Sequence, residues 1–280
     1  MTKIGVIGTG SMGTMLVDAF LESHALQESE ITVFNRSKQK ALRLKESYTQ
    51  LQVASSSKDV VDGSEIIFVC VKPPQIPALL EDIADHLKPS HLLVSITSPI
   101  TVEAIEANVP SKVARAIPSL INQTLSGPSL LSFGSRCTSL DKDILTQLLS
   151  HISEPLEISE DITRVSSDIA SCGPAFFSFL TQGFIDAAVR QTNITESEAT
   201  ELATNMLIGL GKLFEEKRFT LTSLQERICV PGGITGEGID VLRNETGLMF
   251  DHLFQRTHRK YYIEKNHIED SLYKKGRLSK

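Results

Sequence analysis

Three glycines near the start of the chain form the pattern most able to do chemistry, GTGSMG at residues 8–13. The pattern directly follows an apolar run, Lys3–Gly8, and opens a stretch with helical spacing. In such a strand–turn–helix unit Gly8 permits the tight turn, Gly10 lets the backbone approach a pyrophosphate, and Gly13 lets helix and strand pack closely. The N–H groups at the helix start would then face the anion. Although a turn rich in glycine for steric reasons alone is the alternative, the pattern predicts a dinucleotide-binding loop, whose residues are Gly8, Gly10, Ser11, Met12 and Gly13.

The end of the second apolar run indicates which dinucleotide this loop would hold. A site for NAD usually ends this strand with Asp or Glu, which accepts hydrogen bonds from the ribose 2′-hydroxyl and would repel a 2′-phosphate. Here the run ends in Asn35, followed by Arg36 and Ser37. Asn35 does not repel a phosphate, Arg36 can pair with it bidentately, and Ser37 can donate a hydrogen bond. We therefore expect NADP(H) in preference to NAD(H), with a solvated surface role for Arg36 as the alternative.

A third motif, VKP at residues 71–73, follows the third full-length apolar run. This position is the carboxyl end of a strand, where ligands of such sheets bind. Pro73 fixes the chain where backbone would lie along the nicotinamide ribose. Lys72 has three interpretations: a catalytic group, a cofactor contact or a lysine at a helix start. Val71, Lys72 and Pro73 complete the predicted cofactor-binding residues.

The elements that must position these motifs alternate between strand and helix. Short runs rich in Ile, Val, Leu and Phe suit central strands of a parallel sheet covered on both sides. The predicted strands are Lys3–Gly8, Glu30–Asn35, Glu65–Val71, His91–Ile96 and Lys112–Ile117. The predicted helices between them are Ser11–Ser23, Lys38–Tyr48, Pro74–Leu87 and Thr101–Asn108. A hairpin-like stretch at Leu125–Phe133, a helix at Leu140–His151 and a strand at Pro155–Ser159 would finish a doubly wound α/β domain.

From about Ser166 onward the pattern changes to helices alone. The predicted helices are Ser166–Gln191, Glu196–Glu216, Leu221–Cys229 and Gly236–Arg259, and Thr195 with Glu198 forms a capping box before the second of them. Faces rich in Ala, Leu and Phe are wide for solvated helices, so we expect them to bury against a partner helix, either of this chain or of a second subunit. The predicted division is a dinucleotide-binding domain over residues 1–162, a helical dimerisation and substrate domain over 163–265 and a basic tail over 266–280.

Composition excludes several classes of protein. The chain has 280 residues, 41% hydrophobic and 22% charged, which are globular proportions rather than disordered or collagen-like ones. No run of about 18 uncharged apolar residues occurs, so we expect no membrane-spanning helix. The amino end lacks a signal-peptide pattern, so we expect a cytoplasmic protein. The four cysteines form no C-x-x-C pair and the histidines lack helical metal spacing, so we assign no metal and no disulfide framework.

Charge is unevenly distributed along the chain. The net charge is −6, from 34 acidic and 28 basic residues, which argues against a nucleic-acid surface spread over the whole chain. Residues 251–280 nevertheless hold eight Lys and Arg against four Asp and Glu. The end with Lys274, Lys275 and Arg277 has two interpretations: contact with an acidic partner or nucleic acid, or, as we favour, a frayed, solvated terminus.

Together these motifs resemble the pyrroline-5-carboxylate reductase family. The matching segments are GTGSMG at 8–13, NRS at 35–37, VKP at 71–73, IPS at 117–119, CGPAFF at 172–177 and PGGIT at 231–235, and the last two are the most specific. The resemblance implies a Rossmann domain followed by an all-α dimerisation domain, a homodimer with the active site at the subunit interface, and NAD(P)H-dependent reduction of the cyclic imine 1-pyrroline-5-carboxylate to L-proline.

The same resemblance implies a substrate carboxylate held by backbone N–H groups of the PGG turn. Its substrate-binding residues are then Gly232, Gly233, Ile234 and Thr235, and Thr235, with its hydroxyl near the ring, is the catalytic residue. The local sequence agrees, because a turn before a predicted helix presents free amides to a carboxylate without needing an arginine. The alternative is that Thr235 is an ordinary helix cap.

Several positions depart from the family pattern. Val230 and Cys172 stand where serine is usual, Ile234 replaces the first of two threonines, and Ser119 replaces an asparagine. These changes make the pocket less polar and are similar to those of a divergent branch, the reductase-like late-competence proteins of Gram-positive bacteria. They keep open a second function, an NADP-binding sensor or interaction module with little activity. A hydroxyacid dehydrogenase sharing the glycine pattern is disfavoured, because the lysine that it needs is replaced by Phe177.

Overall fold

The computed structural model describes residues 2–276, with side chains as far as residue 272. The chain forms two compact units. The first comprises the residues up to Cys172 together with those from Thr257 onward, and the second is Gly173–Arg256. This division differs from the predicted one, because it begins the helical unit later and assigns the end of the chain to the first unit.

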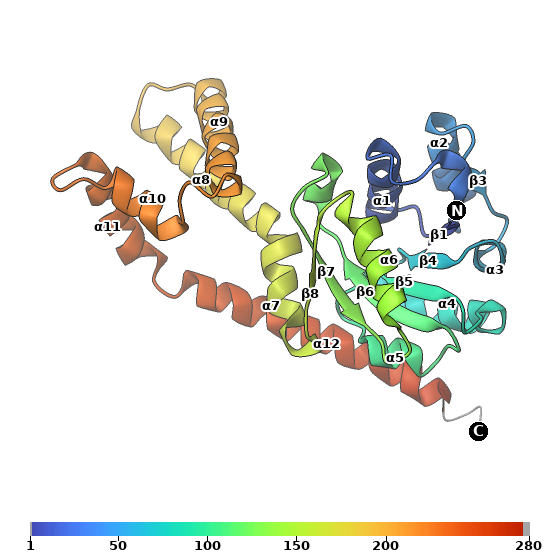
Figure 1. Ribbon diagram of the computed structural model, residues 1–280. Helices are drawn as coiled ribbons and strands as arrows, with labels where there is room; N and C mark the ends of the chain where they lie inside the picture. Colours follow the sequence, from blue (N-terminus) through green and yellow to red (C-terminus); the bar gives the residue numbers. More distant parts are fainter. Residues whose placement is uncertain (1, 277–280) are drawn as a thin grey trace. The chain divides into compact units, whose positions relative to one another are not determined.

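Eight strands of the described chain form one sheet in the order β3-β2-β1-β4-β5-β6-β7-β8 (Figure 1). The strands are β1 Ile4–Ile7, β2 Ile31–Phe34, β3 Gln52–Val53, β4 Ile66–Val69, β5 Leu92–Ser95, β6 Lys112–Ile117, β7 Pro128–Phe133 and β8 Glu154–Glu157. Neighbouring strands are parallel except β6 and β7. The order reverses between β1 and β4, so their carboxyl ends form the switch point of a doubly wound sheet. The predicted α/β class is confirmed.

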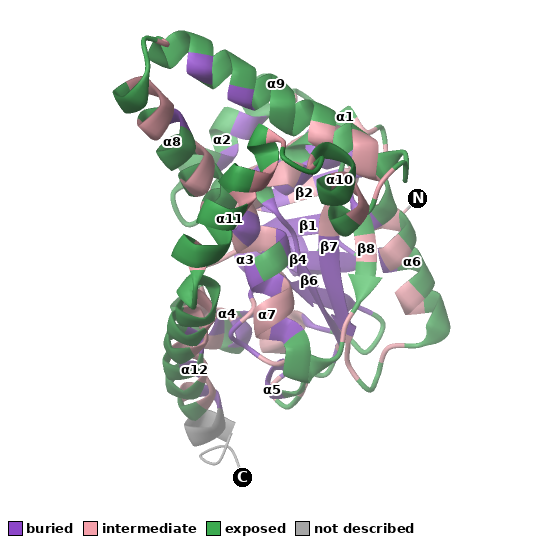
Figure 2. Cartoon of the chain, turned by 90° about the vertical axis from the view of Figure 1, so that its left-hand side faces the viewer, coloured by how far each residue is buried: buried purple, intermediate pink, exposed green. Residues whose placement is uncertain are grey.

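Two apolar layers cover the two faces of this sheet. The helices of the first unit are α1 Ser11–Glu22, α2 Lys38–Ser47, α3 Ser57–Asp62, α4 Ile76–Ile83, α5 Val102–Glu106, α6 Ser139–Ser150 and α7 Thr163–Ser167. In β1, Ile4 and Val6 pack with α1, α2 and α6, whereas Ile7 packs with α3, α4 and α5. Successive side chains of a strand point to opposite faces, so an apolar run covered on both sides is buried throughout. This is the state of β1 and β4 (Figure 2).

Three of the short helical segments of the first unit lie near the carboxyl ends of its strands or after α7. They are η2 Pro73–Gln75 after β4, η4 Leu120–Thr124 after β6 and the π-helical turn η6 Asp168–Cys172 after α7. The π-helical turn, called the π-turn below, divides what the sequence predicts as one helix over 166–191. The stretch predicted as a hairpin contains β7, which pairs antiparallel with β6.

The second unit consists of helices joined by turns, without a strand in its described residues. Its helices are α8 Gly173–Gln191, α9 Glu196–Glu215, α10 Leu221–Ile228, α11 Ile234–Thr246 and the first turns of α12 Met249–Gly276. Ile185 of α8 packs with Ala199 and Ala203 of α9. The predicted capping box before α9 is confirmed, because Thr195 Oγ1 accepts from the Glu198 N–H at 3.3 Å and Glu198 Oε2 accepts from the Thr195 N–H at 2.9 Å.

The end of the chain differs from the expected frayed tail. One predicted helix over 236–259 is replaced by α11 and by α12, which continues to Gly276. Ile268 and Leu272, one helical turn apart and each 3% exposed, pack into the layer with α3, α4 and α5. Thr101 Oγ1 also donates to Glu269 Oε1 at 3.1 Å. Burial of these two apolar side chains outweighs the local excess of charge, so residues 266–272 of the predicted basic tail are packed rather than solvated. The fraying expected at Arg277 lies outside the described residues.

The part of the tail that carries the predicted basic cluster is only partly described. The backbone at Lys274 and Lys275 belongs to α12. Their side chains, and Arg277 altogether, lie outside the described residues. The interpretation of this cluster as a contact for an acidic partner stays untested.

Candidate cofactor and substrate site

The three glycines of GTGSMG differ in what surrounds them. Gly8 has a φ of +104°, and a Cβ atom there would lie 2.7 Å from the Cys70 carbonyl oxygen. A Cβ atom on Gly13 would lie 1.9 Å from the Gly8 carbonyl oxygen, whereas one on Gly10 would meet nothing within 4 Å. Gly8 and Gly13 are therefore required by the fold itself, because any larger residue would clash with backbone. Gly10 leaves open space at the start of α1, which is what close approach of a pyrophosphate requires.

The amino end of α1 is not capped by a side chain. Gly10 is its N-cap residue, and the Thr14 N–H donates to the Gly10 carbonyl at 2.9 Å. The N–H groups before Thr14 have no partner inside the helix, as at every helix start. Thr9 is 3% exposed, and its hydroxyl has no hydrogen-bond partner within the described chain. A buried, unpartnered hydroxyl beside an uncapped helix end fits a group that binds through anionic oxygens.

Asn35 braces the glycine loop. Its Oδ1 accepts from the Thr9 N–H at 3.1 Å, and its Nδ2 donates to the Ser37 carbonyl at 3.0 Å. The side-chain amide thereby ties the end of β2 to the loop after β1. Arg36 and Ser37 are exposed, and Ser37 is the N-cap residue of α2 without a capping hydrogen bond from its side chain. Contact of Arg36 and Ser37 with a cofactor stays a prediction.

A cavity of about 530 Å³ lies between α1 and α2, and the glycine loop forms part of its lining. Lys40 and Arg43 of α2 also line it and bring two cationic side chains to the loop. Neither residue belongs to a motif of the sequence. Their spacing of three places them on one helical face, and the neighbouring Ala41 and Leu44 are buried. The apolar pattern of α2 therefore indicates that Lys40 and Arg43 border the face by which this helix packs.

One carboxylate lines the same cavity. Burial raises the pKa of Asp18, a hydrogen bond with Tyr48 opposes that shift, and the charge of Glu22 adds to it. Burial, followed by the charge of Asp18, raises the pKa of Tyr48 to about 12. Asp18 lies about two helical turns beyond Ser11. Its charge is thus kept away from the first-turn N–H groups.

Lys72 lies just beyond the carboxyl end of β4 and is exposed. It is the N-cap residue of η2, and its N–H donates to Gln75 Oε1 at 3.3 Å. Val71 and Pro73 on either side are half-buried. The structure thus places Lys72 at a helix start, which is one of its three interpretations. A contact of these three residues with a cofactor stays a prediction.

The PGGIT turn lies in the second unit, directly before α11. Gly232 has a φ of +72°, and Gly233 is the N-cap residue of α11, with its N–H donating to the Val230 carbonyl at 2.9 Å. Ile234 and Thr235 are the first two helical residues, and both are exposed. Because Gly233 occupies the cap position, the alternative of Thr235 as an ordinary cap is wrong. Substrate binding by this turn stays a prediction.

Most residues in the helices of the second unit are exposed (Figure 2), and many of them are large and apolar. Among them are Phe177, Phe179, Phe184, Leu202, Ile208, Val241 and Leu242. Phe176 and Leu180, which belong to the predicted apolar face of α8, are half-buried. Large exposed apolar side chains in such number are typical of helices that form protein interfaces. The unit therefore has the surface expected of a dimerisation domain.

Metal and membrane sites find no support in the described part of the chain. No group of three or more His, Cys, Asp or Glu residues between 2 and 276 could hold a metal ion. Over the same residues, no helix combines the length and apolar character needed to cross a membrane.

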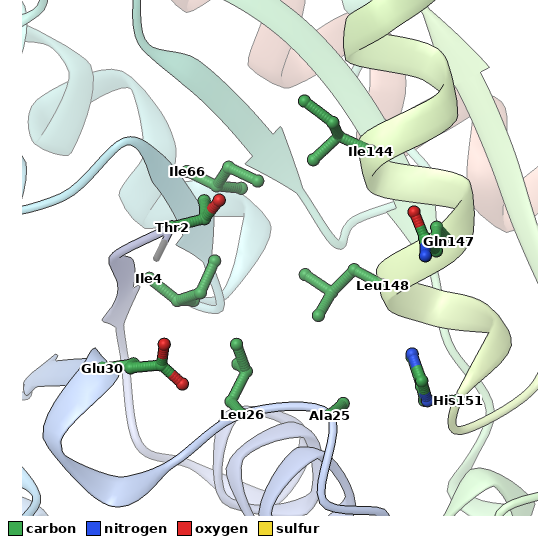
Figure 3. A pocket seen from close by; sticks show the side chains of 10 residues that line it. All are labelled: Thr2, Ile4, Ala25, Leu26, Glu30, Ile66, Ile144, Gln147, Leu148 and His151. Atoms are coloured by element: carbon green, nitrogen blue, oxygen red, sulfur yellow. The ribbon is translucent and has the colours of Figure 1, made fainter.

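A smaller cavity, of about 290 Å³, lies at the other edge of the sheet from the glycine loop (Figure 3). Ile4 and Ile66, at the amino ends of β1 and β4, line one side of it, and Ile144 and Leu148 of α6 line another. Ligands of doubly wound sheets bind at the carboxyl ends of the strands. This cavity is therefore not included in the candidate site.

Comparison with known proteins bears out the resemblance found in the motifs. Residues 3–99 match the family model described as NADP oxidoreductase coenzyme F420-dependent, and residues 160–262 match that for pyrroline-5-carboxylate reductase dimerisation. ComE operon protein 4 of Bacillus subtilis (strain 168) is 49% identical over 259 residues, which are 92% of this chain and 95% of that protein. Pyrroline-5-carboxylate reductase 3 of the same strain is 29% identical over 94% of this chain and 97% of its own length.

Solved structures share the fold over nearly the whole chain. A Plasmodium falciparum pyrroline carboxylate reductase with NADP bound has a TM-score of 0.81 at 21% identity and covers 96% of this chain and 98% of its own. A pyrroline-5-carboxylate reductase from Coxiella burnetii has a TM-score of 0.80 at 21% identity, with the same coverage of both chains. At this identity the likeness concerns the fold, a Rossmann-like unit followed by a helical one.

Proposed function

Because the chain belongs to the pyrroline-5-carboxylate reductase family, in the branch that includes ComE operon protein 4, we propose that it uses NADPH to reduce 1-pyrroline-5-carboxylate, or a close analogue, to L-proline. The observation that carries this proposal is the uncapped start of α1. Gly10 leaves it open, and a cavity with two cationic side chains adjoins it. The arrangement suits a phosphorylated dinucleotide.

The chain has the groups that would hold the pyrophosphate of this cofactor. The first-turn N–H groups of α1, from Ser11 to Gly13, have no hydrogen-bond partner within the helix and lie at the positive end of the helix dipole. The unpartnered Thr9 hydroxyl supplies one more donor beside them. Gly10 has no side chain that would occupy the space.

The preference for NADP(H) over NAD(H) rests on charge. No carboxylate ends β2, because Asn35 occupies that position and its side-chain amide is used to brace the loop. Arg36 follows it, and Lys40 and Arg43 line the adjoining cavity. A 2′-phosphate would form ion pairs with such cations in addition to hydrogen bonds, whereas an uncharged 2′-hydroxyl would form hydrogen bonds only.

NADPH, when bound, supplies the hydride for the imine carbon. We propose that the chain's own residues position the substrate and the cofactor, because holding two reactants at near-attack distance supplies much of a rate enhancement. The N–H groups of Ile234 and Thr235 would bind the substrate carboxylate, and the Thr235 hydroxyl would orient the ring. An imine of this kind is partly protonated near neutral pH, so the reaction requires no acid from the protein.

We further propose that the protein is a homodimer and acts in the cytoplasm. The exposed apolar side chains of α8, α9 and α11 support a homodimer formed through the helical unit. All four cysteines are free thiols, which suits a reducing compartment, so we assign the activity to the cytoplasm.

A second candidate function is an NADP-binding protein with a sensing or interaction role and little activity. Two observations favour it: the relative that is 49% identical is a ComE operon protein, and Val230 and Ile234 make the substrate turn apolar and exposed. The name of that relative suggests a connection with competence. In this alternative the glycine loop binds NADPH, but the turn before α11 binds no imine.

One assay separates the two functions. NADPH oxidation is followed at saturating cofactor with and without 1-pyrroline-5-carboxylate, and NADPH binding is titrated in the same preparation. A substrate-dependent rate with formation of proline supports the reductase. Tight NADPH binding without any rate above background contradicts the reductase and supports the second function. Absence of NADPH binding contradicts both.

A further inference from the structure

A buried ion pair joins α7 to the π-turn. Arg164 Nη2 donates to Asp168 Oδ1 at 2.7 Å, and the two side chains are only 13% and 0% exposed. The second carboxylate oxygen accepts from Thr257 Oγ1 at 2.8 Å and lies 3.5 Å from His258 Nε2, both on α12. The Asp168 carboxylate is therefore bound from two elements of the first unit.

The same guanidinium extends to the loop that leaves β5. Arg164 Nη1 donates to Ser98 Oγ at 3.4 Å, three residues beyond the end of β5. Nη2 also donates to Cys172 Sγ at 3.4 Å, at the last residue of the π-turn. The guanidinium carbon lies 5.6 Å from the centre of the Tyr261 ring, which covers it from α12. One side chain thus connects a loop at the carboxyl edge of the sheet with the end of the π-turn.

The π-turn has a second bond to the same edge of the sheet. Ser171 Oγ donates to the Pro118 carbonyl at 3.0 Å, in the loop that leaves β6. The π-turn is consequently tied to the loops after both β5 and β6. In a doubly wound sheet, one mononucleotide half of a dinucleotide binds at the glycine loop. The other half binds across the switch point between β1 and β4, over the strands that include β5 and β6. In the proposed function that half is the nicotinamide.

The energetics of such a pair favour a geometric role. Removing two charges from water is costly, so a buried ion pair adds little stability compared with apolar packing of the same volume. What such a pair does is hold the groups that it connects, here the Ser98 loop and the π-turn, in one arrangement. π-Helical insertions also occur often at functional sites.

We propose that Asp168 and Arg164 are positioning residues for the nicotinamide half of the cofactor. The pair holds the π-turn and the Ser98 loop in the arrangement that receives the nicotinamide, and neither residue touches the reacting atoms. The inference rests on the proposed function, since it requires a dinucleotide bound at the carboxyl edge of the sheet.

The test compares two ligands that differ by the nicotinamide half. NADPH and 2′,5′-ADP are titrated against the wild-type protein and against Asp168→Asn, which keeps the shape of the side chain and removes its charge. We expect the affinity for NADPH to fall about tenfold, because a small displacement of the receiving groups is enough for that loss. The affinity for 2′,5′-ADP should stay within about twofold, since the adenosine half binds at the glycine loop. The control is Asp161→Asn, an exposed carboxylate in the preceding segment, which should change neither affinity.

Two further variants keep the test decisive if Asp168→Asn folds poorly. Thr257→Val removes one donor to Asp168 and should shift the ratio of the two affinities in the same direction by a smaller factor. Arg164→Lys keeps the charge but loses the planar guanidinium, and should lower NADPH affinity as Asp168→Asn does. Combined with Asp168→Asn it should add little, because residues acting as one unit are not additive.

The outcomes distinguish a failure of the proposed function from a failure of the positioning role. If the wild type binds neither ligand, the proposed function is wrong. If the wild type binds both and Asp168→Asn changes both affinities equally, or changes neither, the proposed function stands and the positioning role is wrong. A stability loss without a change in the ratio of affinities likewise contradicts positioning, because a purely structural pair would act in that way.

Discussion

Arg115 and Glu160 form a two-bond ion pair between β6 and the segment that leads into α7. Arg115 Nη1 donates to Glu160 Oε1 at 3.0 Å, and Nη2 donates to Oε2 at 2.8 Å. Nη2 also donates to Thr163 Oγ1 at 2.6 Å and to Ser132 Oγ at 3.2 Å. The arginine is the largest fully buried side chain of the described chain. It anchors the residues that carry the π-turn to β6, an inner strand of the sheet.

Glu160→Ala should lower the free energy of unfolding by about 1–2 kcal/mol, because a buried guanidinium loses its charged partner but keeps two hydroxyl and two carbonyl acceptors. Urea denaturation measures the change. Glu157→Ala is the matched control, since Glu157 pairs with Lys142 at 2.6 Å on the exposed surface. That variant should cost less than about 0.5 kcal/mol. Equal losses in the two variants would contradict the anchoring role.

Gly10→Ala and Gly13→Ala should separate binding from folding. A Cβ atom on Gly13 has no room beside the Gly8 carbonyl, so Gly13→Ala should lower the melting temperature strongly or prevent folding. A Cβ atom on Gly10 meets nothing in the chain, so Gly10→Ala should fold normally. It should weaken NADPH binding about 10-fold or more, because the methyl group occupies the space of the pyrophosphate. Unchanged NADPH affinity in a folded Gly10→Ala protein would place the cofactor elsewhere.

Lys40→Ala should reduce the preference for NADPH. Loss of one charge-assisted contact with the 2′-phosphate should weaken NADPH binding about tenfold and leave NADH binding unchanged. Lys38→Ala, in the same helix but outside the cavity lining, is the control and should change neither affinity. Titrations at two salt concentrations add a second readout, because the effect of a surface charge weakens as salt rises. A parallel loss of NADH affinity would argue against a 2′-phosphate contact.

Thr235→Ala should lower kcat about 10- to 100-fold without abolishing turnover, since the hydroxyl orients the ring and transfers no proton. The helix should remain intact, because Gly233, and not Thr235, occupies the cap position of α11. Circular dichroism checks this, and steady-state kinetics gives kcat and KM. Thr246→Ala, at the other end of α11, is the control with expected wild-type kinetics. Wild-type kinetics in Thr235→Ala would remove the residue from the site.

Tyr48 should make stability depend on pH in the alkaline range. Its folded pKa is raised from 10.0 to about 12, first by burial and then by the charge of Asp18. A group with a raised folded pKa contributes stability that is complete below its unfolded pKa and is lost as pH rises through the folded value. The wild type should therefore lose stability more steeply than Tyr48→Phe between about pH 10 and pH 12. Urea midpoints measured across this range give both slopes, and equal slopes would show that the Tyr48 titration is not linked to folding.

The local features of the site could be predicted from the sequence. The glycine loop, the apolar runs of the strands and the capping box at Thr195 depend on residues a few positions apart, and their steric and hydrogen-bonding rules act at that range. The family motifs are also short runs of neighbouring residues, so the sequence alone is enough to find them. For the same reason the alternation of strands and helices sufficed to predict a doubly wound sheet followed by a helical domain.

Tertiary structure alone decided which distant residues meet. Lys40 and Arg43 line the cavity because α2 packs beside α1, and Arg164 extends to Ser98 because α7 docks on the sheet. The end of α12 is helical and packed because Ile268 finds an apolar layer built from α3, α4 and α5. The pattern of α2 indicates that Lys40 and Arg43 share a helical face, but not which element that face lies beside. Each of these contacts depends on surface that exists only once the chain has folded.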